Sequence, residues 1–303
     1  MTKRFFLILL PLCFLLCSGS CNPTQTEQPN EAAPAEPELL SIFRTAYPDV
    51  TFSAAYDTLI GDWLVTVTAD DRRAELYWCG GRLLSADKIP EKENYRVLLY
   101  DYAEAVPDPE DFSEQDIERI RAFSAPETRS ASAGTPPFFY DTIYDCASQA
   151  AVEQHITRIT FLGKRANVHE RIRDPLAAVE RDIRVLAETD PEARAFVTNL
   201  SQTDGYYWRT IRDSGNRSFH SIGIALDILP VGWQQKNIYW AWRRDIDPEK
   251  WMLTPLDRRW MPPESIVAAF EKHGFIWGGK WIIWDNMHFE YHPELILYRK
   301  SKK

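Results

Sequence analysis

Two stretches decide the fold of this 303-residue chain: Ser218-Phe-His-Ser-Ile-Gly-Ile-Ala-Leu-Asp-Ile228 and Trp284-Asp-Asn-Met-His-Phe-Glu-Tyr-His292. Each combines a short apolar run with His and Asp residues. His220 and Asp227 are seven residues apart, so their side chains would lie on opposite faces of one straight strand. Gly223 can adopt a positive φ, and a turn there would aim His220 and the Asp227 of a following strand at one point.

The second stretch predicts a loop followed by a strand. Asp285 and the next residue, Asn, form a turn signal after an aromatic run, so we expect Asp285 to project from a loop and His288 to begin the strand. In that strand His288, Glu290 and His292 share one face. Pro follows His292 and ends the strand, so His292 ranks below His288 as a metal ligand, and Glu290 is a candidate partner that orients a ligand.

The residue types in these stretches are those of a catalytic metal site. Two imidazoles and one carboxylate are suitable ligands for zinc and leave a fourth coordination position for water. The carboxylate that does not bind the metal could then serve as a base. His155, His169 and His273 lie outside the pattern, and we interpret them as packing or surface residues.

Together the two stretches resemble the zinc D-alanyl-D-alanine carboxypeptidase family, which includes vancomycin-resistance D,D-peptidases and L-alanyl-D-glutamate endolysins. The similarity covers about residues 208–290. It implies zinc ligands at His220, Asp227 and His288, a general base at Asp285 that acts with a zinc-activated water, and a cationic Arg209 that binds the substrate or the transition state. The resemblance also implies that Ser218 contacts the substrate.

The resemblance implies a zinc-dependent peptidase that cleaves peptidoglycan stem peptides in the manner of a D,D-carboxypeptidase. Two alternatives stay open. One is an endopeptidase of the same family. The other is a non-catalytic, peptidoglycan-binding envelope lipoprotein whose zinc site is structural.

The chain is expected to have an α+β fold with two folded parts. Residues 136–303 would form a small antiparallel sheet with flanking helices, among them 147–161 and 175–188, around a single zinc site. Residues 39–135 would form a smaller α+β module. There, runs at 63–68 and 74–78 predict a hairpin, residues 95–102 could add a third strand, and Ser113 is the expected N-cap of a short helix.

The first 38 residues predict export and anchoring. Lys3 and Arg4 precede a short apolar run, which is typical of a signal peptide over residues 1–20. Cys21 would be the lipidated residue of a bacterial lipoprotein, and the Pro- and Glu-rich residues 22–38 would form a disordered linker. We therefore expect a location in the bacterial cell envelope, periplasmic or extracytoplasmic, with a lipid anchor in a membrane.

Charge and cysteine content limit the remaining possibilities. The chain has 35 Lys and Arg against 44 Asp and Glu, and its net charge of -9 would repel nucleic-acid phosphate, so nucleic acid is excluded as a partner. Cys79 and Cys146 remain after the signal and the lipidated cysteine are set aside. An exported protein could pair them in a disulfide or keep them as two buried thiols.

Overall fold

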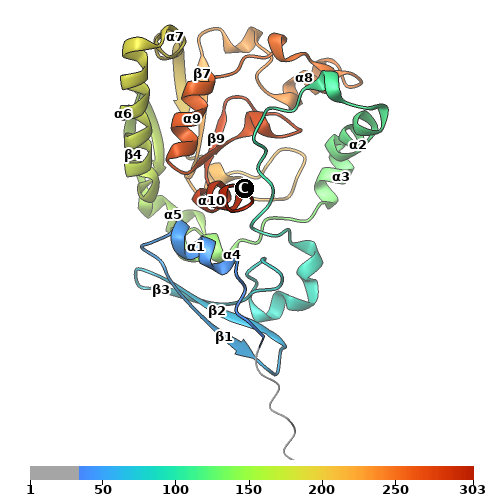
Figure 1. The fold of residues 1–303 in the computed structure, drawn as a ribbon, viewed down its shortest axis with the longest axis vertical. Coiled ribbons are helices and arrows are strands. Elements are labelled where there is room, and N and C mark those ends of the chain that lie inside the picture. Colours follow the sequence, from blue (N-terminus) through green and yellow to red (C-terminus); the bar gives the residue numbers. More distant parts are fainter. Residues whose placement is uncertain (1–33) are drawn as a thin grey trace, which may run out of the picture. The chain divides into compact units, whose positions relative to one another are not determined.

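The C-terminal half is built around a four-stranded antiparallel sheet. A computed structural model describes residues 34–303. The sheet order is β6 (Leu200–Asp204), β7 (Ala225–Pro230), β9 (His288–Tyr291) and β8 (Phe275–Trp277). The α+β class and the small antiparallel sheet are therefore confirmed. Strands β7 and β9, which carry the two deciding stretches, are neighbours at the centre (Figure 1).

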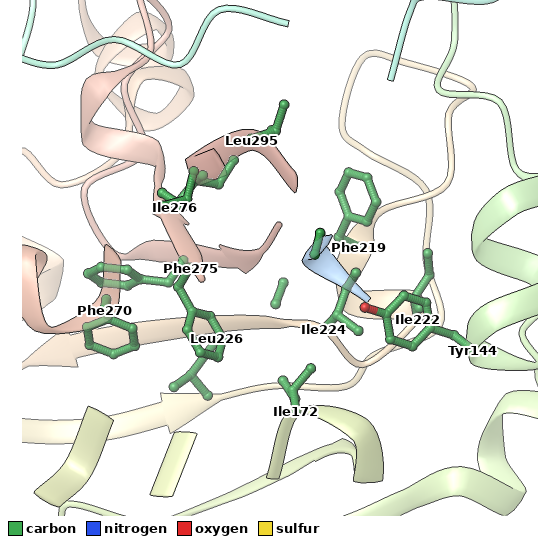
Figure 2. Close-up of a cluster of buried hydrophobic side chains, with 14 of the residues drawn as sticks. Tyr144, Ile172, Phe219, Ile222, Ile224, Leu226, Phe270, Phe275, Ile276 and Leu295 are labelled. Carbon is green, nitrogen blue, oxygen red and sulfur yellow. The ribbon is translucent and has the colours of Figure 1, made fainter. Parts of the chain in front are cut away.

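Helices contribute the apolar side chains that cover this sheet. The predicted helix 175–188 is confirmed as α6 (Arg173–Thr189), which buries a stripe of Leu and branched residues and packs against α7 (Pro191–Thr198) and α9 (Glu264–Lys272). Phe270 of α9 stacks on Phe289 of β9, with ring centroids 3.9 Å apart. Figure 2 shows how side chains from β7, α9, β8 and the last helix, α10 (Pro293–Ser301), meet in one buried cluster.

The helix predicted over 147–161 is wrong in its second half. Only α5 (Gln149–Val152) and a 3₁₀ turn are helical, and β4 (Ile156–Phe161) then pairs with β5 (Lys164–His169). Four of the six β4 residues are Ile or Thr, whose branched side chains favour a strand. Leu162 and Gly163 both have positive φ and form the tight turn between the strands.

The N-terminal part contains the predicted hairpin and capped helix. Strands β1 (Thr51–Asp57), β2 (Asp62–Ala69) and β3 (Arg72–Tyr77) form an antiparallel sheet in that order, preceded by α1 (Leu40–Ala46). Ser113 caps α2 (Glu114–Ser124) through a capping box with Asp116, as predicted. The predicted third strand at 95–102 is wrong, because within this segment only Tyr95 forms a bridge, and it is an isolated one.

Residues 35–303 form one compact unit, in which the two parts share their core. The helix α4 (Phe138–Tyr144) packs against β2 and β3, and α1 contacts α10. Two further short helices are α3 (Pro126–Ala131) and α8 (Trp240–Ile246) (Figure 1). The division of the chain at residue 135 stays a prediction.

Cys79 and Cys146 are both buried free thiols and do not form a disulfide with each other. Burial raises the pKa of the Cys79 thiol to about 11 and that of Cys146 further, which keeps both protonated at neutral pH. Among the described residues, no helix has the length and apolar character needed to span a membrane. The predicted signal peptide, Cys21 and most of the linker lie outside the described residues.

Candidate metal centre

His220 is held by the loop that precedes β7. It lies in a 3₁₀ turn, Phe219–Ser221, and its side chain is buried. The Gly205 carbonyl lies 2.6 Å from His220 Nδ1 and can accept its proton, which leaves Nε2 as the free ligand atom. A Cβ at Gly205 would lie 2.1 Å from the Asn167 carbonyl oxygen, so only glycine allows this close approach.

Asp227 and His288 face each other across the centre of the sheet. They are directly paired in the antiparallel register of β7 and β9, which places their side chains on the same face. Asp227 Oδ1 lies 2.8 Å from His288 Nδ1. Although burial opposes ionisation, His220 and His288 hold the pKa of Asp227 well below its usual range. The carboxylate is therefore charged and ready to bind a cation.

The three residues form one compact donor group. Among the described residues, it is the only group of three His, Cys, Asp or Glu side chains close enough to hold a metal ion. His220 Nε2 lies 3.2 Å from His288 Nδ1 and 3.3 Å from Asp227 Oδ1. Neighbouring donors of a tetrahedral zinc ion with ligand bonds of about 2.0–2.1 Å are about 3.3–3.4 Å apart. Two imidazoles and one carboxylate at these separations fit a zinc ion with one open coordination position.

Gly223 makes the turn that brings His220 to Asp227. Its φ is +80°, and its carbonyl accepts a hydrogen bond from the His169 amide at 2.8 Å. A Cβ at this position would lie 2.6 Å from Ile156 Cδ1 and 2.8 Å from the His169 nitrogen. The turn predicted from the sequence is thus present, and the packing of β4 and β5 holds it in place.

Gly223→Ala is expected to lower the free energy of unfolding by about 2 kcal/mol or more and to weaken zinc binding, because it adds backbone strain and displaces the His220 turn. Gly163→Ala is the matched control: its φ is +81°, but a Cβ there would contact nothing within 4 Å. Denaturant unfolding and zinc titration of both variants measure the difference. An equal loss of zinc affinity in Gly163→Ala would contradict a local role for Gly223.

Asp285 lies beside the donor group but outside it. Its backbone pairs with Tyr239, and its buried Oδ1 atom has no hydrogen-bond partner among the described residues. Burial is the largest cause that raises the pKa of Asp285, to about 8. The carboxylate of Asp227 adds to the rise, whereas His288 and Arg209 oppose it. Such a carboxyl can accept and return a proton near neutral pH.

The two remaining predicted residues lie on the same loop as His220. The Arg209 carbonyl accepts a hydrogen bond from the Ser218 amide at 3.2 Å, and the exposed Arg209 side chain is close enough to Asp285 to affect its pKa. Ser218 is buried, and its hydroxyl accepts a hydrogen bond from the His220 amide at 3.3 Å. Ser218 therefore caps the ligand's turn, while its contact with substrate stays a prediction.

Further residues around the centre were only partly foreseen. Glu290 lies 2.8 Å from His288 Nε2 and accepts its proton, in agreement with the predicted role as an orienting partner. His292 does not join the donor group, and its Nε2 atom lies 3.3 Å from Glu290 Oε2. The Trp281 ring lies 5.6 Å from the His288 ring. The sequence places Trp281 in an aromatic run but gives no signal that its ring lies beside His288.

Comparison with known proteins supports the same class of protein. Residues 212–291 match the family model of D-alanyl-D-alanine carboxypeptidase, which confirms the resemblance seen in the sequence for this segment. The match supports a metallopeptidase that acts on peptidoglycan. Residues 39–100 match a domain of unknown function (DUF8518). No curated protein and no solved structure matches the chain.

Proposed function

We propose that this chain is a zinc-dependent peptidase that cleaves peptidoglycan stem peptides in the manner of a D,D-carboxypeptidase. The observation that carries the proposal is the His220, Asp227 and His288 donor group with its 2.8–3.3 Å separations. Asp285 beside it has a buried carboxyl oxygen without a hydrogen-bond partner among the described residues. The family match over residues 212–291 supports the substrate class.

Zinc and the residues of the site would each have a separate role in the reaction. When bound, zinc would polarise the scissile carbonyl as a Lewis acid and lower the pKa of water toward about 7. Asp285 would take the proton from the attacking water and return it to the leaving amine. Glu290 would keep His288 in the tautomer whose Nδ1 atom faces the ion. Arg209 would stabilise the negative charge that develops on the carbonyl oxygen or bind a substrate carboxylate.

The test uses the full chain, purified sacculi and defined stem peptides, with and without a chelator, and identifies products by mass. Chelator-sensitive release of the C-terminal residue is the expected result. Cleavage inside the peptide would favour the endopeptidase alternative. If the zinc-loaded protein binds sacculi and cleaves nothing, the structural-zinc alternative replaces the proposal.

Arg209→Ala is expected to retain zinc and lower kcat/KM by about 10²–10³-fold, the loss typical of one transition-state donor. Arg173→Ala, which removes an exposed arginine at the start of α6, is the control and should leave the rate unchanged. Steady-state cleavage of a stem peptide measures both. A wild-type rate in Arg209→Ala would contradict the role of the guanidinium.

We also propose that Cys21 carries a lipid that anchors the protein to a membrane of the bacterial envelope. The support is the sequence pattern of residues 1–21. Cys21→Ser is expected to move the protein from the membrane fraction to the soluble fraction, or to stop removal of the signal peptide. Unchanged fractionation with normal processing would contradict lipidation.

A further inference from the structure

A continuous line of buried polar side chains leads away from the metal centre. His288 Nε2 lies 2.8 Å from Glu290 Oε1, and Glu290 Oε2 lies 3.3 Å from His292 Nε2. On its other side, His292 Nδ1 lies 2.8 Å from Glu294 Oε1. All four side chains are buried, and Glu294 is fully inaccessible to solvent. The line thus leaves β9 and enters the start of α10.

The line ends at a residue of the N-terminal part. Tyr47, which directly follows α1, donates its hydroxyl hydrogen to Glu294 Oε2 at 2.7 Å, although the two residues are 247 positions apart. Tyr140 of α4 makes a longer contact of 3.3 Å to the other oxygen of Glu294. Burial is the main reason that the pKa of Tyr47 lies well above its usual value, so its hydroxyl remains a donor at neutral pH.

The energetics of burial explain why such a line holds its members in fixed positions. Taking a carboxylate out of water is strongly unfavourable unless hydrogen bonds satisfy its oxygens. Glu294 accepts hydrogen bonds from Tyr47 and His292, and Glu290 accepts one from His288. His292 Nε2 has no hydrogen-bond partner among the described residues, but it lies within ion-pair distance of Glu290. The His292 ring is thus held between the carboxylates of Glu290 and Glu294, and the hydrogen bond from His288 to Glu290 leaves His288 Nδ1 facing Asp227.

We infer that the N-terminal part completes the metal centre: Tyr47, acting through Glu294 and the intervening side chains, positions the ligand His288. Tyr47 is then a positioning residue, in the segment that matches the domain of unknown function. The inference rests on the proposed metal site. It assigns to residues 39–100 a contribution to metal affinity that the peptidase segment does not supply alone.

Tyr47→Phe tests the inference, because it removes the hydroxyl and keeps the ring in the core. Competition with a chromophoric chelator is expected to show an about 10-fold weaker zinc Kd, with one equivalent still bound at saturation. Tyr77→Phe is the matched control. Its hydroxyl also donates to a carboxylate in the same part of the chain, Asp57, at 2.7 Å, but leads to no ligand. Its zinc Kd should equal that of wild type.

Glu294→Gln provides a second variant that keeps the shape of the side chain. It should weaken zinc binding as well, and the double variant with Tyr47→Phe should lose less than the two single losses combined. An unchanged zinc Kd in both single variants, or an equal loss in Tyr77→Phe, would overturn the inference and leave the peptidase proposal intact. Failure of wild type to bind zinc would overturn both.

Discussion

Replacing His220, Asp227 or His288 by alanine is expected to remove about one equivalent of zinc and, with it, detectable peptidase activity. Each residue supplies one of three donor atoms that lie 2.8–3.3 Å apart, so each replacement leaves two ligands where zinc requires at least three from the protein. Metal analysis after extensive dialysis, together with stem-peptide cleavage, measures both effects.

Two other histidines are compared with the ligand variants, and His273 is the control. His273 directly follows α9, pairs with Asp182 at 2.8 Å and lies outside the donor group, so His273→Ala should keep its zinc. His292→Ala should still bind one equivalent at saturating zinc but with a weaker Kd, because its ring lies outside the donor group and contacts the carboxylates that position His288. If His288→Ala kept its zinc while His292→Ala lost it, the ligand assignment would be wrong.

The metal centre could be predicted because its determinants are local in the sequence. Alternation along a strand places His288 and Glu290 on one face. Gly223 is the only glycine between His220 and Asp227, and it therefore indicates where the chain can turn. The direct pairing of Asp227 with His288 across β7 and β9 could not be derived, since the register depends on how the whole sheet assembles.

The local sequence pattern gave a wrong prediction where helix and strand preferences compete. The segment 147–161 has apolar residues at helical spacing, but its second half is rich in Ile and Thr and pairs with β5. The sheet contacts outweigh the helical pattern there. The bond from Tyr47 to Glu294 had no sequence signal at all, because a contact across 247 residues arises only from the packing of α1 beside α10.

Asp285→Asn is expected to keep the fold and the full equivalent of zinc while lowering kcat by about 10²-fold or more. Asparagine preserves the shape of the side chain, and Asp285 lies outside the donor group, so metal content should not change. What is lost is the proton acceptor, because the amide of asparagine cannot take a proton from water as a carboxylate can. Asp174→Asn, at the exposed start of α6, is the matched control and should retain the wild-type rate. Metal analysis and steady-state cleavage of a stem peptide separate the possible results. Loss of zinc would make Asp285 a ligand, and a wild-type rate with full zinc would exclude it as the base.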